Sequence, residues 1–279
     1  MNMGVEQYIY EMLGRPDCQI MAPVANEIIS FPSVDWIRPI DWSEAPAGAA
    51  SDEKLLLLGG CDLLQVATYC STNRAEYVNS AIAGHRIRHD DPGFILSPRT
   101  SVARSSALRS VPCWSAESTV EFDEDVRTAS VLVISLWEAL LGDFLLLDGD
   151  ILIRLAPRLL GAKDTLATPS EAAPTGAQIL RFTLEQKLDL VARSLGRLTA
   201  LSERARLRFL LGTNTRLVTA ELDARIEYNR FAEAYCQKNR EFEFVPVDEI
   251  VPVSEVIDGM HFTRLGYHRI AERLGDRIR

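Results

Sequence analysis

The stretch LLLLGGCDLLQ, residues 55–65, decides the fold class of this chain. Its continuous apolar run is typical of a strand that is buried on both faces of a parallel sheet. The run stops at two glycines, and a helix is predicted to begin near Asp62. Because reactive groups lie at the carboxyl ends of the strands in such sheets, Cys61 stands where a functional side chain is expected.

Strands and helices alternate along the rest of the chain. Further strands are predicted within HRIRHDDPGFILS, SVLVISLW, ARLRFLLGTN and EFEFVPVDEI, and helices over 62–84, 178–203, 221–239 and from about Arg264 onward. Parallel strands joined by helices need right-handed crossovers, and these crossovers cover both faces of the sheet. The sequence therefore predicts an α/β fold of three layers, α/β/α, around a central parallel sheet.

The predicted domain organisation is simple. Residues 1–50 are predicted to be an N-terminal extension and linker, because they contain several prolines and end in the small residues of APAGAAS. Residues 51–279 read as one α/β domain. The segment near 142–177 is interpreted as an insertion that carries a short hairpin and ends in a polar, proline-containing loop.

Composition narrows the class of protein and its partners. The chain has 279 residues, and its 47% hydrophobic and 25% charged residues are those of an ordinary globular protein. A net charge of -9 disfavours nucleic acid and anionic membranes as partners. We expect no signal peptide and no membrane span. Five scattered cysteines without a CxxC pair favour free thiols in a reducing cytoplasm. The oligomeric state stays open.

The last loop supplies a second set of reactive residues. It reads DGMHFTRLGYHRI from residue 258, so Asp258 and His261 stand just before a helix whose expected N-cap is Thr263. A thiol, an imidazole and a carboxylate are the nucleophile, base and orienting acid of a catalytic triad. The sequence therefore predicts that Cys61, His261 and Asp258 act together.

These two motifs resemble those of the SGNH, or GDSL-type, hydrolase superfamily. The matching residues are Gly59, Gly60 and Cys61 in the first block, and Asp258, His261, Thr263, Gly266 and Tyr267 in the last. Cysteine stands at the position of the family's nucleophilic serine, as in branches associated with polysaccharide or natural-product assembly. The family's second-block glycine has no match, and its third block is replaced by SLWEALL.

The resemblance implies a flavodoxin-like sheet and acyl chemistry. The implied function is an acyltransferase or hydrolase that attacks a small-molecule or carrier-bound ester or thioester through a Cys61 thioester, with His261 as the base and Asp258 orienting it. No metal and no organic cofactor is implied. A thioester passes readily to amines and thiols, which inclines the prediction toward transfer.

Five further residues are candidates for the oxyanion or substrate. Backbone amides around residues 61 and 62 are expected to hold the oxyanion, and Gly60 in the same turn is a further candidate. Asp62 is expected to cap the helix that follows. Asn214, in GTN after a later strand, is a candidate oxyanion donor, and Glu138 a candidate active-site carboxylate. Arg99 lies in a loop that could bind phosphate of a carrier or coenzyme, or could be an ordinary polar loop.

Other interpretations remain open at this level. The chain could be a plain esterase, or an SGNH fold that has lost catalysis and binds a glycan or protein. Cys61 by itself could be a small core residue. The HRIRHDD segment, residues 85–91, has metal-capable side chains but reads better as a solvated edge.

Overall fold

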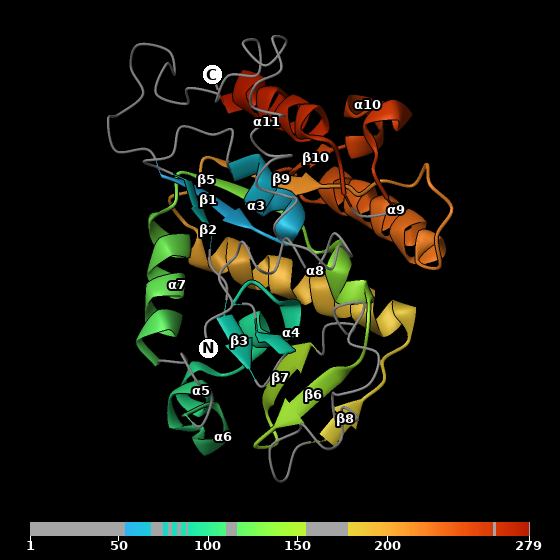
Figure 1. The fold of residues 1–279 in the computed structure, drawn as a ribbon. Helices are drawn as coiled ribbons and strands as arrows, with labels where there is room; N and C mark the ends of the chain where they lie inside the picture. Colours follow the sequence, from blue (N-terminus) through green and yellow to red (C-terminus); the bar gives the residue numbers. More distant parts are fainter. Residues whose placement is uncertain are drawn as a thin grey trace, which may run out of the picture.

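The computed structural model describes residues 54–67, 75–77, 80–82, 85–87, 89–109, 116–154, 178–258 and 261–278 (Figure 1). The predicted N-terminal extension, residues 1–50, lies outside the described residues. The described chain is a mixed α/β structure that contains a parallel sheet.

Five parallel strands form the main sheet, in the order β10-β9-β5-β1-β2. Their bounds are β1 Leu55–Leu58, β2 Ala75–Tyr77, β5 Val131–Ile134, β9 Leu207–Leu211 and β10 Glu243–Val245. Numbered in chain order, the strands therefore lie side by side as 2-1-3-4-5. Because β1 pairs with β5 on one side and with β2 on the other, its leucine run is enclosed, as predicted.

Helices cover both faces of this sheet, and the alternation of side chains along β1 explains how. Leu56 and Leu58 pack in one cluster with α7 (Ala116–Thr128), α8 (Leu184–Leu201) and α9 (Leu222–Lys238). Leu55 and Leu57 pack on the other face with α3 (Cys61–Ala67) and α11 (Arg264–Ile278). Burying each leucine contributes about 1.5–3 kcal/mol to the free energy of unfolding. The two faces of this short strand therefore bind the sheet to the helices on both of its sides.

The longest predicted helix begins later than its sequence suggested. Residues Gln178–Leu180 form strand β8, and α8 begins at Leu184 behind a capping box. In that box Thr183 accepts a hydrogen bond from the Gln186 N–H while the Gln186 side chain accepts one from the Thr183 N–H. These bonds satisfy amides that would otherwise lack partners at the helix start, which fixes the boundary.

A second sheet, in the order β7-β6-β8, lies across α8 from the main sheet (Figure 1). Strands β6 (Phe144–Leu147) and β7 (Ile151–Arg154) are antiparallel, so the hairpin predicted in this segment is confirmed. Its turn places Asp148 and Gly149 at φ of 50° and 84°. Asp-Gly is one of the residue pairs that favour such left-handed angles in hairpin turns.

One local prediction between residues 62 and 97 is wrong, and another is right about the presence of a strand but not about its sheet. The helix predicted over 62–84 ends at Ala67, and Ala75–Tyr77 is instead the edge strand β2, because β1 accepts a parallel neighbour there. The strand predicted in HRIRHDDPGFILS is not in the main sheet. His85–Ile87 forms β4, antiparallel to β3 (Ser80–Ile82), and Pro92–Leu96 is the helix α4, capped by Asp91.

Shorter helical elements complete the described chain. These are α5 (Arg99–Arg104), α6 (Ser106–Arg109), η3 (Trp137–Leu140), α10 (Val247–Ile250) and η4 (Val253–Glu255). Of the helices in the described ranges, none combines the length and the apolar character that a bilayer crossing requires.

Candidate functional site

The turn after β1 lies at the point where the strand order reverses. From β1 the chain runs to β2 on one side of β1, and then returns to β5 on the other side. Doubly wound sheets bind their ligands at such a reversal, outside the carboxyl ends of the two strands. Gly59 and Gly60 follow β1 there, and Cys61 is the first residue of α3. The Ser135 N–H, just beyond β5, donates to the Leu58 carbonyl at 2.8 Å and closes the two strand ends together.

The side chains of Glu138 and Asp62 leave no room for a side chain at Gly60. A Cβ at this position would lie 1.9 Å from Glu138 Oε1 and 3.2 Å from Asp62 Oδ1. The first distance is far below any real contact, so the Glu138 carboxylate occupies the space that a side chain would fill. The sequence had placed Gly60, Asp62 and Glu138 near the site independently, and the structure brings all three together.

Asp62 ties the start of α3 to the loop after β5. Its Oδ1 accepts from the Leu63 N–H at 2.8 Å, and its Oδ2 accepts from the Ser135 hydroxyl at 2.7 Å. A carboxylate in the first turn of a helix is favoured by the amides exposed there. Asp62 was expected to cap α3, but it is the second residue of this helix and accepts from the next amide. Ser135 was missed by sequence reasoning; its place directly after a buried strand was the available signal.

A buried ion cluster holds Glu138. Arg154, the last residue of β7, donates from Nη2 to Glu138 Oε2 at 3.2 Å and from Nε to Asp91 Oδ2 at 3.1 Å. The exposed fractions of the Arg154, Asp91 and Glu138 side chains are 5%, 5% and 15%. Sequence reasoning missed Arg154, although a cation that ends the apolar strand ILIR is an unusual residue for a core.

Asp258 and His261 are in direct contact. The Asp258 carboxylate lies 2.8 Å from His261 Nδ1 and accepts from the His261 N–H at 2.8 Å. The His261 side chain is mostly buried, whereas that of Asp258 is half-exposed. Since an ionised carboxylate only accepts hydrogen bonds, it favours the proton on Nδ1 and leaves Nε2 as the basic nitrogen of the neutral ring.

The rest of the last block fixes this loop against α3. Thr263 accepts from the Gly266 N–H at 3.3 Å, which makes it the predicted N-cap of α11. Phe262 is buried in the same cluster as Leu63 of α3, and the Tyr267 ring meets it edge-on. A Cβ on Gly266 would lie 2.8 Å from Phe262 Cβ. His261 is therefore carried on a loop that packs on the helix beginning at Cys61.

Asn214 lies beyond the carboxyl end of β9 and is almost fully buried. Its Oδ1 accepts from the Arg216 N–H at 2.9 Å, and its backbone carbonyl accepts from Arg225 Nη1 at 2.7 Å. Within the described part of the chain, no group accepts a hydrogen bond from Asn214 Nδ2. The amide is thus a fixed and buried donor at the correct edge of the sheet, and its role as an oxyanion donor stays a prediction.

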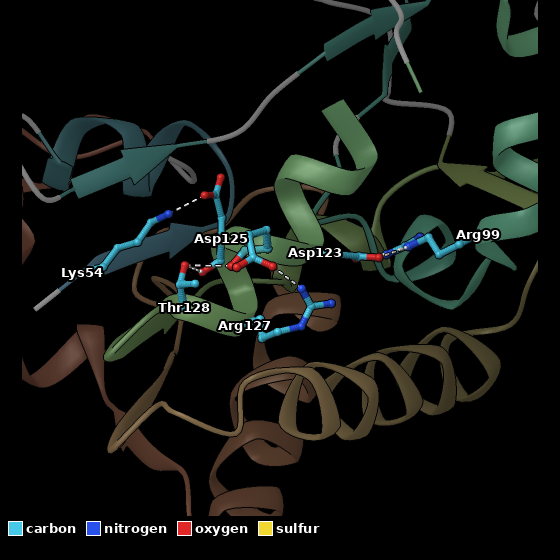
Figure 2. Close-up of polar contacts among 7 residues, drawn as sticks. Lys54, Arg99, Asp123, Asp125, Arg127 and Thr128 are labelled. Atoms are coloured by element: carbon cyan, nitrogen blue, oxygen red, sulfur yellow. Dashed lines mark hydrogen bonds and ion pairs between the residues drawn. The ribbon is translucent and has the colours of Figure 1, made fainter. Parts of the chain in front are cut away.

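Arg99 is engaged in contacts on another part of the molecule. Its Nε and Nη2 donate to the two oxygens of Asp123, each at 2.8 Å, and its Nη1 donates to the Phe94 carbonyl at 3.0 Å. Figure 2 shows this fork, with Asp125 of the same helix turned to Lys54 at the start of β1. Arg99 therefore joins α5 to α7, and none of these contacts is with the Cys61 turn.

The HRIRHDD segment is partly described. His89 is buried against the rings of Phe94 and Phe122, and this burial lowers the pKa of its imidazole to about 4. Asp91 caps α4 and binds Arg154. Among the residues that the structure describes, no group of three or more His, Cys, Asp or Glu side chains is arranged to hold a metal ion.

Comparisons with known proteins found no family model that matches the chain and no curated protein that is significantly similar to it. Functional assignment therefore depends on the residues and on their geometry.

Proposed function

We propose that this chain is an acyltransferase or hydrolase of SGNH type that acts on an ester or thioester through Cys61. The contact between the Asp258 carboxylate and His261 Nδ1, at 2.8 Å, carries the proposal. It supplies an oriented base on a loop that packs against the helix beginning at Cys61. A buried structural histidine would not need a half-exposed carboxylate bound to both its ring and its own N–H.

The sheet supports the same proposal. Its strand order, 2-1-3-4-5, is the flavodoxin-like order of doubly wound sheets. Helices lie against both faces, as a three-layer SGNH fold requires. The proposed nucleophile and the proposed base follow the first strand and precede the last helix, respectively. That chain order is also the SGNH order.

The proposed chemistry proceeds through a thioester. His261 Nε2 takes the Cys61 thiol proton as the sulfur attacks the acyl carbonyl carbon, and backbone amides near Cys61 stabilise the oxyanion. The leaving alcohol or thiol departs with the proton from His261. Water or an acceptor alcohol or amine then attacks the thioester and gives its proton to His261, and the C–S bond breaks as the sulfur regains a proton.

Transfer fits this nucleophile at least as well as hydrolysis does. A thioester reacts readily with amines and thiols, so the acyl group can pass to an acceptor before water reaches it. The proposed donors are small-molecule or carrier-bound acyl thioesters, and a biosynthetic role follows from a donor of this kind.

Intact-protein mass spectrometry with a panel of acyl thioesters tests the proposal. We expect a mass increase equal to one acyl group, mapped to Cys61 by peptide analysis, with no such adduct in Cys61→Ala and a much slower one in His261→Ala. Cys236 is an internal control, because burial raises the pKa of its thiol to about 12 and keeps it protonated. Acylation spread over several cysteines, or the absence of any Cys61 adduct across the panel, would contradict the proposal and favour a binding module.

A further inference from the structure

Two carboxylates flank the turn that carries Cys61. The space beside the Gly60 Cα is bounded by Glu138 Oε1 on one side and by Asp62 Oδ1 on the other. Since consecutive Cα atoms are about 3.8 Å apart, the Glu138 carboxylate lies within about 7 Å of the Cys61 Cα. Cysteine sites that favour the thiolate are instead surrounded by cations. The carboxylates of Glu138 and Asp62 beside this turn carry the opposite sign from those cations.

Glu138 is held in this position from outside the main sheet. Its Oε2 accepts from Arg154 at 3.2 Å, and Arg154 is in turn fixed by Asp91 at 3.1 Å. Asp91 itself accepts from the Gly93 N–H as the cap of α4. Arg154 ends β7, so the three-stranded sheet and α4 together set the place of one carboxylate beside the turn. Among the hydrogen bonds of the described residues, Arg154 is thus shared between two carboxylates.

We propose that Glu138, held by Arg154 and Asp91, is a positioning residue that keeps Cys61 a neutral thiol at rest, so that His261 must remove its proton during attack. This inference rests on the proposed function of Cys61 as the nucleophile. It deepens that function, because it distinguishes base-assisted attack from attack by a preformed thiolate and imidazolium pair.

The elements around this turn carry other titratable groups. They are Asp62 on α3, Asp258 and His261 before α11, and His268 with Glu272 on α11. Of these, the imidazoles alone can stabilise a thiolate. A negative charge at Glu138 disfavours an ionised Cys61, because like charges repel. Removing the charge of Glu138 should therefore make the Cys61 thiol ionise at a lower pH.

The pH profile of Cys61 alkylation tests this inference without any acyl substrate. Iodoacetamide rates are measured from pH 5.5 to 10 by peptide mass spectrometry, which separates Cys61 from the other thiols. We expect a midpoint above pH 7 in the unmodified chain. In Glu138→Gln, which preserves the shape of the side chain, we expect the midpoint to fall by about 0.5–1 pH unit. Glu121→Gln, on the exposed face of α7, is the matched control and should leave it unchanged.

Asp91→Asn provides a second variant in case Glu138→Gln folds poorly. Removing this charge leaves the positive charge of Arg154 less compensated. The midpoint should therefore fall in the same direction but by less, because Asp91 contacts Arg154 and Glu138 itself lies against the turn. A merely structural role for Glu138 would change thermal stability and leave the midpoint in place. A midpoint below pH 7 in the unmodified chain, or one that does not fall in Glu138→Gln, overturns the inference.

The alkylation experiment can succeed or fail independently of the proposed acyl chemistry. If the midpoint shifts as expected and no acyl thioester modifies Cys61, the electrostatic inference holds and the acyl chemistry fails. If Cys61 is acylated and the midpoint does not respond to Glu138, the chemistry holds and the inference is wrong.

Discussion

The Asp258 carboxylate contacts His261 twice, through the backbone N–H at 2.8 Å and through ring Nδ1 at 2.8 Å. The first contact fixes the loop, and the second fixes the ring and its tautomer. An asparagine at this position could offer its amide N–H to Nδ1 and so favour the wrong tautomer.

Asp258→Asn should therefore slow acylation of Cys61 by about 10- to 100-fold, and His261→Ala by about 100- to 10,000-fold, since general-base catalysis contributes an effect of that size. The smaller effect is expected for Asp258 because water screens its half-exposed side chain. Single-turnover acylation followed by intact mass measures both rates. Asp223→Asn on the exposed side of α9 is the control. Equal rates for Asp258→Asn and the unmodified chain would contradict the orienting role.

Asn214→Leu tests the buried amide after β9. If Nδ2 holds the oxyanion, its loss should lower the acylation rate at saturating substrate by about 100- to 1,000-fold while KM changes little. Urea denaturation of the same variant separates this effect from a structural one. A variant that loses stability but keeps its acylation rate would show that Asn214 only shapes its loop.

Gly60→Ala should disturb the site through Glu138. The new Cβ would stand 1.9 Å from Glu138 Oε1, so either the carboxylate leaves Arg154 or the turn moves. We expect a loss of about 1–3 kcal/mol of unfolding free energy, the usual cost of overpacking. In a Glu138→Ala background the same substitution should cost clearly less, and a double-mutant cycle measures this coupling.

Gly196→Ala is the matched control for that substitution. Gly196 lies within α8, and a Cβ there would meet nothing within 4 Å. Alanine should therefore stabilise the protein by about 0.5–1 kcal/mol, since it is the better helix former. If the two glycines respond alike, close approach of Glu138 is not the reason for Gly60.

Arg154→Met should be among the most destabilising single changes in the described chain. It leaves Asp91 and Glu138 without their shared cation in a buried setting, and breaking such a cluster costs about 3–5 kcal/mol. Arg181→Met removes an exposed pair with Asp143 and should cost less than about 0.5 kcal/mol. Urea unfolding midpoints compare the two variants. Similar losses would mean that the Arg154 cluster contributes no more than a surface pair.

His89 should make stability depend on pH. Burial lowers its imidazole pKa from 6.5 to about 4, so between these values the unfolded chain binds a proton that the folded chain does not. The contribution of neutral His89 to the stability of the folded state is therefore complete above pH 6.5, and it is lost as the pH falls toward 4. From pH 7 to 4.5 the unmodified chain should lose about 2 kcal/mol more than His89→Gln. Parallel stability curves for the two proteins would exclude this contribution.

Much of the sheet could be predicted from the sequence because its strands are continuous apolar runs. Leu55–Leu58 and Val131–Ile134 are buried on both faces and need no neighbour to identify them. Ala75–Tyr77 could not be found in this way: a three-residue edge strand carries little pattern of its own, and it is a strand because β1 accepts a parallel partner there. Gln178–Leu180 was likewise absorbed into a helix prediction, because nothing local distinguishes it from the first turn of α8.

The sequence by itself determined the alternation of strands and helices, the place of Cys61 at a strand end, and the pairing of Asp258 with His261. These features depend on residues that are close in the chain, and local periodicity or spacing reports them. Only the tertiary structure decided that Glu138 lies against Gly60, that Arg154 and Asp91 hold it there, and that Ser135 binds Asp62. Such contacts join segments far apart in the chain, 73 residues for Ser135 and Asp62 and still more for Glu138 and Gly60. They exist because the strand order brings the ends of β1 and β5 together, and no local pattern encodes that order.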